Sequence, residues 1–257
     1  MMHAWLKRKM QGWGGSGLDV VDRRGLRALK GRYRGRRVFV IGNGPSLNDT
    51  DLAPLRDEVT IGSNGIFLLF DRMGFRPTLY TVEDTLVAED RAAVINGLRG
   101  MTKVFPNDLR YCIERDADTV FINFCRPGYV GFPRFSDNFE RRVYWGGTVT
   151  FLNLQLAWFM GASAIYLVGL DHSYRKPVAG DAVVGNVISS GSADDNHFHP
   201  DYFGPGFRYH DPMVERMETG YRKAREFLEA RGCPVFNATV GGRLEVFPRV
   251  SLPEVVK

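Results

Sequence analysis

The feature that most constrains the fold is a short apolar run that ends directly in a glycine-rich turn. The run is Arg37–Ile41, and the turn Gly42–Ser46 follows it without a spacer. A continuous apolar run of this length, bounded by glycine, is typical of a strand that is buried on both faces of a parallel sheet. The sequence therefore predicts a strand that feeds a tight turn, with Pro45 in the first turn of the helical segment behind it.

Strand and helix patterns alternate along the rest of the chain. Further strands are predicted at 58–64, 77–82, 104–105, 119–124, 164–168 and 234–237. Helical segments are predicted at 46–55, 66–72, 85–98, 148–160 and 213–231. This alternation predicts an α/β fold of the Rossmann-like, doubly wound kind with a mostly parallel sheet. Residues 172–211 show little periodicity, and a loop of this length predicts a lid over a site.

Positive charge is concentrated at the N-terminus. Residues 1–37 hold eleven Lys and Arg against two Asp, whereas the remainder carries a net charge of −4. The sequence predicts a basic leader over 1–36 and one Rossmann-like domain over 37–257, with its lid at 172–211. Two interpretations of the leader stay open: contact with an anionic membrane through Trp5, Leu6 and Trp13, and a solvated arm. We expect no nucleic acid partner.

The compartment follows from what the sequence does not contain. No apolar stretch reaches the roughly 18 residues of a transmembrane helix, and the first residues lack the apolar core of a signal peptide. Three widely spaced cysteines match no zinc pattern and suit a reducing environment. We therefore expect a cytoplasmic protein, with peripheral contact to the inner membrane as an alternative.

Polar residues follow the predicted strands at one edge of the sheet. In doubly wound folds, ligands bind outside the carboxyl ends of the strands. The residues expected there are Asn43, Asn64, Asp84, Asp171 and Asn237.

The glycine turn is predicted to hold the phosphate and ribose of a nucleotide. Gly42 and Gly44 permit close approach of the backbone, free N–H groups attract anions, and Ser46 suits a cap or a phosphate contact. Leu47 and Asn64 replace the third glycine and the acidic residue of a dinucleotide fingerprint, so NAD is disfavoured. The Walker lysine is missing as well. A glycine turn without a ligand is the alternative.

The predicted lid supplies candidate catalytic groups. His197 and His199 suit a general base, and in an extended loop both rings would point the same way. Tyr202 and Arg208 suit donors to a phosphate. Two alternatives stay open, a purely structural loop and a metal site. The ligands of that metal site would be Asp194, Asp195, His197 and His199. We expect neither a bound metal nor a tightly bound cofactor.

Four segments together resemble a known family. They are Ile41–Leu47, Ser63-Asn64, Gly146-Gly147-Thr148 and Ile165–Asp171. The set resembles the 6-hydroxymethylpterin pyrophosphokinase MptE-like domain family, which is related to the bacterial Cst-type sialyltransferases and the Maf flagellin glycosyltransferases. The resemblance runs from about residue 36 to the end, with 100–140 poorly matched.

The sialyltransferase side of this resemblance implies roles for particular residues. Gly42, Asn43 and Gly44 would hold the phosphate and ribose of CMP, and Asn64 would bind the nucleotide. Gly146 and Gly147 would stand where those enzymes carry a Ser-Gly pair. Tyr174 resembles a tyrosine that binds the leaving phosphate. The segment 194–199 resembles the one that carries their histidine base, with His197 and His199 both fitting.

Three functions stay open on these grounds. The first is a glycosyltransferase that takes a CMP-linked nonulosonate or Kdo-type sugar and acts in surface glycan or glycoconjugate assembly. The second is an MptE-like diphosphokinase that uses ATP, with Mg²⁺ held by carboxylates such as Asp84 and Asp171. The third is a nucleotide-binding module without catalysis. In the first function, Asp171 is expected among the catalytic residues, in contact with a ribose hydroxyl or an acceptor sugar.

Overall fold

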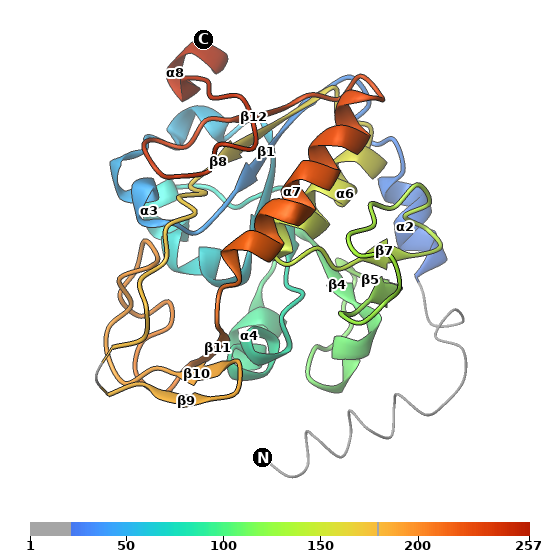
Figure 1. The fold of residues 1–257 in the computed structure, drawn as a ribbon. Coiled ribbons are helices and arrows are strands. Elements are labelled where there is room, and N and C mark those ends of the chain that lie inside the picture. Colours follow the sequence, from blue (N-terminus) through green and yellow to red (C-terminus); the bar gives the residue numbers. More distant parts are fainter. Residues whose placement is uncertain (1–21, 179) are drawn as a thin grey trace.

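The computed structural model of the chain describes residues 22–178 and 180–257 (Figure 1). The strands are β1 Arg37–Ile41, β2 Val59–Ser63, β3 Leu79–Thr81, β4 Thr102–Pro106, β5 Thr119–Ile122, β6 Phe124–Cys125, β7 Val143–Tyr144, β8 Ala164–Val168, β9 Ala182–Val184, β10 Val187–Ser189, β11 Arg208–His210 and β12 Val235–Asn237. The α-helices are α2 Arg23–Leu29, α3 Phe70–Met73, α4 Thr85–Asp90, α5 Ala92–Gly97, α6 Val149–Phe159, α7 Val214–Glu229 and α8 Leu252–Val255. The 3-10 helices are η1 Pro45–Asp49, η2 Ala53–Leu55, η3 Asn64–Leu69 and η4 Asn107–Tyr111.

Seven parallel strands form the central sheet in the order β12-β8-β1-β2-β3-β4-β5. The chain adds strands from β1 outward to β5 and then returns through α6 to place β8 on the other side of β1. The strand order therefore reverses between β1 and β8, which is where a doubly wound sheet opens a crevice for a ligand. The predicted Rossmann-like α/β fold is confirmed.

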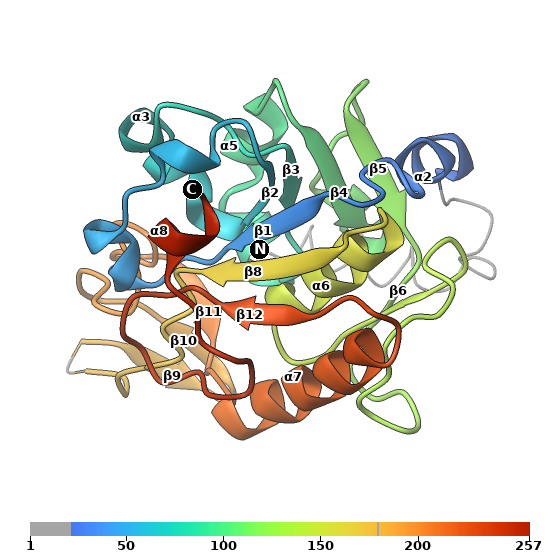
Figure 2. The same cartoon turned by 90° about the horizontal axis from the view of Figure 1, so that it is seen from above.

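Helices cover both faces of the sheet, because alternate strand residues point to opposite sides. Val38 and Val40 join the core beneath α2, α6 and α7, whereas Phe39 and Ile41 join the core beneath η1, η3, α3, α4 and α5. Figure 2 shows α6 and α7 on one side of the strands and α3 and α5 on the other. The result is a three-layer sandwich with two separate cores.

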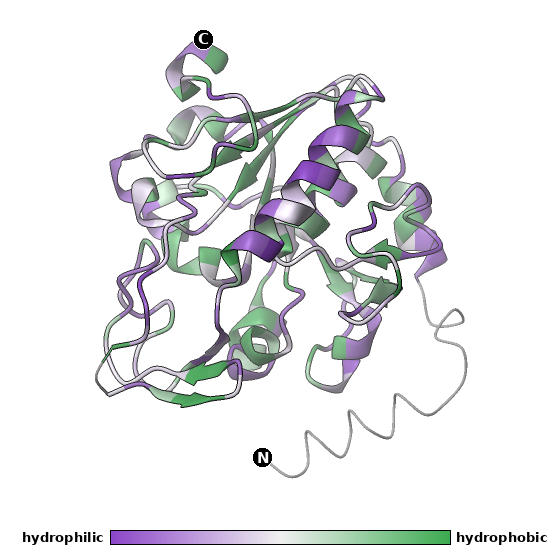
Figure 3. Ribbon diagram, in the orientation of Figure 1, coloured by the Kyte–Doolittle hydropathy of each residue, from purple (hydrophilic) through white to green (hydrophobic). Residues whose placement is uncertain are grey.

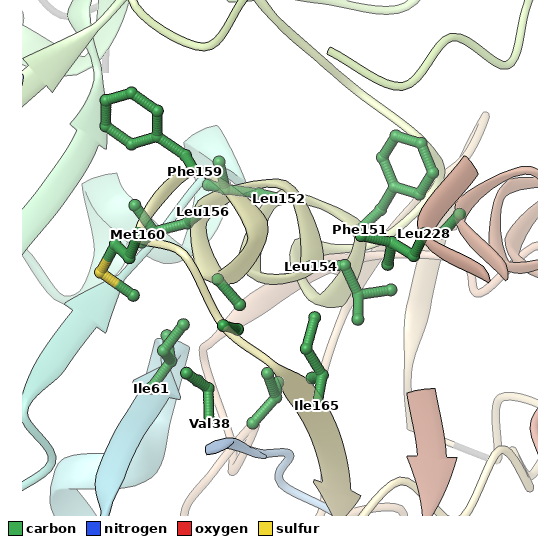
Figure 4. Packing of buried hydrophobic residues seen from close by; sticks show 14 of the residues in the cluster. Val38, Ile61, Phe151, Leu152, Leu154, Leu156, Phe159, Met160, Ile165 and Leu228 are labelled. Carbon is green, nitrogen blue, oxygen red and sulfur yellow. The ribbon is translucent and has the colours of Figure 1, made fainter. Parts of the chain in front are cut away.

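Helix α6 is the central helix of its layer and orients the start of the site. Its buried residues run almost without interruption from Thr150 to Phe159, and Leu154 packs over Ile165 of β8 (Figure 4). Helix α7 covers α6 from outside with a buried stripe that includes Met217, Tyr221 and Leu228, and its outer face is hydrophilic (Figure 3). A helix that is apolar on most sides needs such a second layer.

The predicted lid contains more structure than its sequence suggests. Strands β9, β10 and β11 form a small antiparallel sheet within residues 172–211. Each strand has three residues, which is too short to show an alternating pattern. The helix predicted at 85–98 is likewise divided into α4 and α5 at Arg91, whose guanidinium binds the carbonyl oxygens of Asp201 and Tyr202 in the lid.

The second part of the basic segment 1–36 is folded against the domain. Helix α2 begins after Asp22, whose side chain accepts a hydrogen bond from the Gly25 N–H, and buries Leu26 and Leu29 in the core. Residues 1–21, with the predicted membrane-contacting Trp5, Leu6 and Trp13, lie outside the described residues. In the described ranges, no helix has both the length and the apolar character needed to span a bilayer.

Candidate functional site

The carboxyl edge of the sheet holds two adjoining cavities at the point where the strand order reverses. The smaller has a volume of about 100 Å³ and is lined by the glycine turn after β1 and by Gly169–Asp171 after β8. The larger, of about 460 Å³, extends under the lid toward the end of β3. Both are lined by Asn64, Thr148, Val149, Tyr174, Asn196 and His197. The two cavities therefore form one cleft with a shared wall.

Three N–H groups of the glycine turn are already bonded within the protein. The N–H of Gly42 donates to the carbonyl of Val168 at 2.7 Å, and that of Gly44 donates to the carbonyl of Gly169 at 2.9 Å. The N–H of Ser46 donates to Oδ1 of Asp171 at 3.1 Å. These three amides therefore have a structural role, and the contact of the turn with an anion stays a prediction.

That role explains why glycines stand here. A Cβ on Gly42 would overlap the backbone of Gly169, and a Cβ on Gly44 would overlap the Asp171 carboxylate. The Ser46 hydroxyl donates to Oδ2 of the same carboxylate at 2.7 Å. Asp171 and Ser46, expected as a catalytic and a nucleotide-binding residue, therefore bind each other and fix the turn against the loop after β8.

Two asparagine side chains remain for a ligand in the smaller cavity. The Oδ1 atoms of Asn43 and Asn64 are buried and have no hydrogen-bond partner within the described residues. Asn64 is held in the left-handed region, at φ 53°, and its carbonyl accepts a hydrogen bond from the Tyr80 hydroxyl at 2.6 Å. A buried polar atom without a partner costs about 1–3 kcal/mol. Such a cost at two residues that line the same cavity points to a ligand that satisfies both.

The start of α6 provides a second anion-binding geometry beside the glycine turn. Thr148 caps the helix, and Gly147, Thr148 and Val149 line the larger cavity. Gly147 adopts φ 98°, which favours glycine. The N-terminus of a helix carries unpaired N–H groups and a positive dipole end, so it attracts phosphate. Gly146 does not reach the cleft, because it lies against the ring of Phe151.

The lid is fastened directly to the glycine turn. The N–H of Phe198 donates to the carbonyl of Asn43 at 3.0 Å, and the side chain of Asn48 donates to the carbonyl of Phe198 at 3.2 Å. His197, the neighbouring residue, is thereby placed between the two cavities. Its Nδ1 lies 2.7 Å from Oδ2 of Asp194, and its ring stacks on Tyr202 with centroids 3.8 Å apart.

The structure separates the two candidate histidines. His199 accepts a hydrogen bond from the Asp201 N–H at 3.1 Å and lines neither cavity. The two rings do not share a side, because the chain is bent over residues 195–199 instead of continuing extended. Only His197 of the pair is in a position to meet a substrate in the cleft.

The predicted phosphate donors of the lid are placed differently from the expectation. Arg208 is held by Asp90 and Glu89 at the end of α4 and does not line the cleft. This pairing replaces the predicted contact of Arg208 with a phosphate. The ring of Tyr202 is buried and stacks on His197, so it does not point toward a phosphate as a donor. Tyr174 lines both cavities and remains available to a ligand.

Asn237, which was expected at the ligand edge of the sheet, is used within the protein. Its side chain donates to the carbonyl of Leu244 and accepts a hydrogen bond from the Thr239 N–H.

Two residues of the larger cavity, Arg126 and His210, carried no usable signal in the sequence, and a third, Glu83, carried an ambiguous one. Glu83 follows β3 and is buried, Arg126 approaches it from the segment after β6, and His210 closes β11. The Nδ1 of His210 lies 2.7 Å from Oδ2 of Asp84, 126 residues away in the chain. Only the Glu83-Asp84 dipeptide at a strand end hinted at this cluster, because its partners are distant in sequence.

Burial and pairing shift several pKa values in the cleft. Burial raises the pKa of Glu83 to about 7, although Arg126 acts in the opposite direction. Burial also acts to raise the pKa of Asp194 and of Asp84, but hydrogen bonds from His197 and His210 outweigh it and both values are lowered. The hydrogen bond to Asp84 raises the pKa of His210. Near neutral pH, Glu83 is therefore about half protonated, whereas Asp84 and Asp194 are ionised.

The carboxylates expected to hold Mg²⁺ in a diphosphokinase do not fit that task. Asp171 is bonded to Ser46, and Asp84 accepts from the N–H groups of Leu86 and Val87 as well as from His210. Among the residues with a described placement, no three His, Cys, Asp or Glu side chains group as metal ligands. Of the alternative metal set, Asp195 is paired with Arg175.

Fold and cleft together define a doubly wound α/β protein with a ligand site at the reversal of its strand order. The sequence profile of the family described as 6-hydroxymethylpterin diphosphokinase MptE-like matches residues 18–177, more than half of the chain. The chain belongs to this MptE-like family.

Among solved structures, the chain is similar to the Maf glycosyltransferase from Magnetospirillum magneticum AMB-1, with a TM-score of 0.54 and 21% identity. The alignment covers 88% of this chain and 37% of the Maf chain, so this chain corresponds to about a third of that protein. At this identity the likeness concerns the fold. No curated protein matches the sequence.

Proposed function

We propose that the protein is a glycosyltransferase that uses a nucleotide-activated sugar. One juxtaposition carries the proposal: the His197–Asp194 pair stands at the wall shared by the two cavities, beside the unpartnered oxygens of Asn43 and Asn64. A histidine oriented by a buried carboxylate is a general base, and the asparagines suit the hydroxyl groups of a ribose. The fold shared with a Maf glycosyltransferase agrees with this function.

The proposed reaction assigns a proton and an electron pair to particular groups. Asp194 holds Nδ1 of His197, which leaves Nε2 to take the proton from a hydroxyl group of the acceptor. The acceptor oxygen forms a bond to the anomeric carbon of the sugar, and the bond from that carbon to the phosphate oxygen breaks. The nucleotide leaves with the electron pair, and its phosphate charge is stabilised by the N-terminus of α6 and by the Tyr174 hydroxyl.

We propose CMP as the nucleotide and a nonulosonate or Kdo-type sugar as the transferred group. The support is the resemblance of the four segments to the sialyltransferases, together with two cations, Lys176 and Arg216, that line the larger cavity. A carboxylate on the sugar would be attracted to either side chain.

The proposed place of the reaction is surface glycan assembly in the cytoplasm, at the inner face of the membrane. The positive charge of the leader 1–36 supports a contact with anionic lipid.

The family description favours a second candidate, transfer of diphosphate from ATP to a pterin alcohol. Against it stand Asp84 and Asp171, whose carboxylates are already bonded within the protein. A nucleotide-binding module without turnover is the third candidate. Nucleotide binding separates the first two, and turnover of a CMP-sugar separates the third from the first.

Thermal unfolding with CMP, CDP, ATP and ATP plus Mg²⁺ tests the proposal. CMP at a hundred times its dissociation constant stabilises a protein by about 2.7 kcal/mol, which corresponds to a rise in Tm of roughly 5 °C or more. We expect this rise with CMP in the absence of metal, its loss in Asn43→Ala, and its retention in Asn107→Ala. Asn107 is the matched control, since its Oδ1 is also buried without a partner but lies outside both cavities. Stabilisation by ATP with Mg²⁺ alone would contradict the proposal.

A further inference from the structure

A second polar cluster lies in the larger cavity, away from the glycine turn. Glu83 and Asp84 follow β3, Arg126 reaches both the backbone carbonyl and the carboxylate of Glu83, and His210 binds Asp84 from β11. All four side chains line the larger cavity and none lines the smaller. The proposed transfer mechanism uses none of them.

The cluster is close to neutral in charge. Arg126 is shared between Glu83 and Asp108, with its Nε 2.7 Å from an Asp108 oxygen, and His210 is paired with Asp84. A site for phosphate or a carboxylate needs an excess of cations, which paired charges do not supply. The side chain of Glu83 is only 7% exposed, and a buried carboxyl near its pKa both donates and accepts hydrogen bonds. The cluster therefore suits a ligand that is uncharged and rich in hydroxyl groups.

The walls around the cluster add apolar surface. Trp145, Val87, Phe203 and Tyr209 line the same cavity, whose volume of about 460 Å³ exceeds the smaller cavity severalfold. A neutral sugar presents both hydroxyl groups and apolar C–H faces, so it matches a wall of this mixed composition better than an apolar or an anionic ligand does.

The position of His197 relates the two cavities to each other. Asn43 lines only the smaller cavity, the Glu83 cluster lines only the larger, and His197 lines both. A base that takes a proton from an acceptor must stand between the donor and the acceptor. The proposed nucleotide site, the base His197 and the Glu83 cluster thus follow one another along one cleft.

We propose that Glu83, Asp84, Arg126 and His210 form a subsite for the hydroxyl groups of a neutral sugar, the acceptor of the transfer. The role of this sugar as the acceptor rests on the proposed function, whereas the binding of a neutral sugar at this cluster is independent of that function. The subsite holds the acceptor with one hydroxyl group toward His197.

Saturation-transfer NMR on the full chain tests the subsite with defined probes. The probes are the methyl glycosides of glucose, galactose and mannose, with glucuronate as the anionic comparison. We expect at least one methyl glycoside to bind more tightly than glucuronate. Binding should weaken at least fivefold in His210→Ala and Glu83→Ala, and should stay within twofold in Glu83→Gln, which keeps a hydrogen-bonding group of the same shape. His199→Ala, outside the cavity, should bind as the unaltered protein does.

The stability of the variants and the binding of the probes together decide whether the subsite exists. Because Glu83→Ala leaves Arg126 with one partner fewer, the Tm of every variant is measured first, and His210→Ala carries the test if Glu83→Ala does not fold. The subsite is refuted if no methyl glycoside binds, if glucuronate binds more tightly than all of them, or if His210→Ala leaves binding unchanged. CMP stabilisation, measured on the same samples, reports on the proposed function separately: loss of CMP binding with glycoside binding intact refutes that function and not the subsite.

Discussion

Two histidine–aspartate pairs in one cleft share a hydrogen-bond length and differ in their surroundings. In both pairs Nδ1 of the histidine lies 2.7 Å from a carboxylate oxygen. The ring of His197 is 17% exposed and stacks on Tyr202, while its partner Asp194 is 4% exposed and accepts N–H groups of the lid. The ring of His210 is 38% exposed, and Asp84 caps α4.

The difference shows that the pair itself does not define a role. The His197 pair belongs wholly to the lid segment and is carried to the glycine turn by Phe198. The His210 pair joins the lid to α4 and stands next to a buried carboxyl, Glu83. We therefore expect removal of His197 to affect turnover, and removal of His210 to affect the binding of the acceptor and the fixing of the lid.

The largest effect should come from His197→Ala. Loss of a general base lowers turnover by about 10²–10⁴-fold, and CMP affinity should change little because the asparagines and α6 are untouched. Turnover of a CMP-sugar and CMP affinity are measured side by side. His199→Ala is the control, because its ring lies outside the cleft. Equal losses in the two variants would show that the histidine acts through the fold of the lid.

Glu83→Gln should change how stability depends on pH. Burial raises the pKa of Glu83 from 4.5 to about 7, so the folded protein keeps a proton that the unfolded chain releases in this window. The contribution of Glu83 is thus present below pH 4.5 and is lost as the pH rises through 7, which amounts to about 3 kcal/mol.

Urea unfolding at pH 5 and pH 8 measures how the free energy of unfolding depends on pH. The variant Glu83→Gln should lack the part of this dependence that Glu83 contributes. The groups that face Glu83 are Arg126, Asp84, His210 and Asp108. His210, whose pKa is raised, also loses its stabilising contribution as the pH rises, but it is present in both proteins and cancels in their difference. An identical slope in the two proteins would place the Glu83 carboxyl in contact with water.

A smaller effect is expected from His210→Ala on catalysis. The KM for the acceptor should rise about tenfold, equivalent to about 1.4 kcal/mol, while hydrolysis of the donor in the absence of acceptor stays unchanged. The comparison of the two rates in one preparation separates acceptor binding from chemistry. A loss of donor hydrolysis equal to that of His197→Ala would reverse the roles of the two pairs.

The smallest effect is the coupling between the pairs in the double variant His197→Ala/His210→Ala. The two histidines bind different carboxylates and share no hydrogen-bond partner in the described structure, so their effects on unfolding free energy should add within about 0.5 kcal/mol. Urea unfolding of the four proteins of the cycle measures the coupling. A larger value would show that the lid responds as one unit to both pairs.

The fold could be predicted because its signals are local. Strands β1 and β8 have the bounds that their apolar runs indicate, and the helix predicted at 148–160 is α6 within a residue at each end. The position of the cleft followed from the same information, because polar residues at strand ends of a parallel sheet share one edge.

The chemistry of the site depends on contacts that no local pattern encodes. The N–H groups of Gly42 and Gly44 donate to the last residue of β8 and to the residue after it, more than 120 residues away. His197 pairs with Asp194 whereas His199 begins a turn that the Tyr202 N–H closes, and Arg208 of the lid pairs with Asp90 of α4. Partners at such separations become visible only when the sheet and the lid are in place.

A crystal structure with CMP tests the central claim, that the cleft between the glycine turn and the start of α6 holds a nucleotide. We predict the phosphate at the N–H groups of Thr148 and Val149, and ribose hydroxyl groups bonded to Oδ1 of Asn43 and Asn64. A CMP molecule bound elsewhere, with both asparagine oxygens still without partners, would contradict the account.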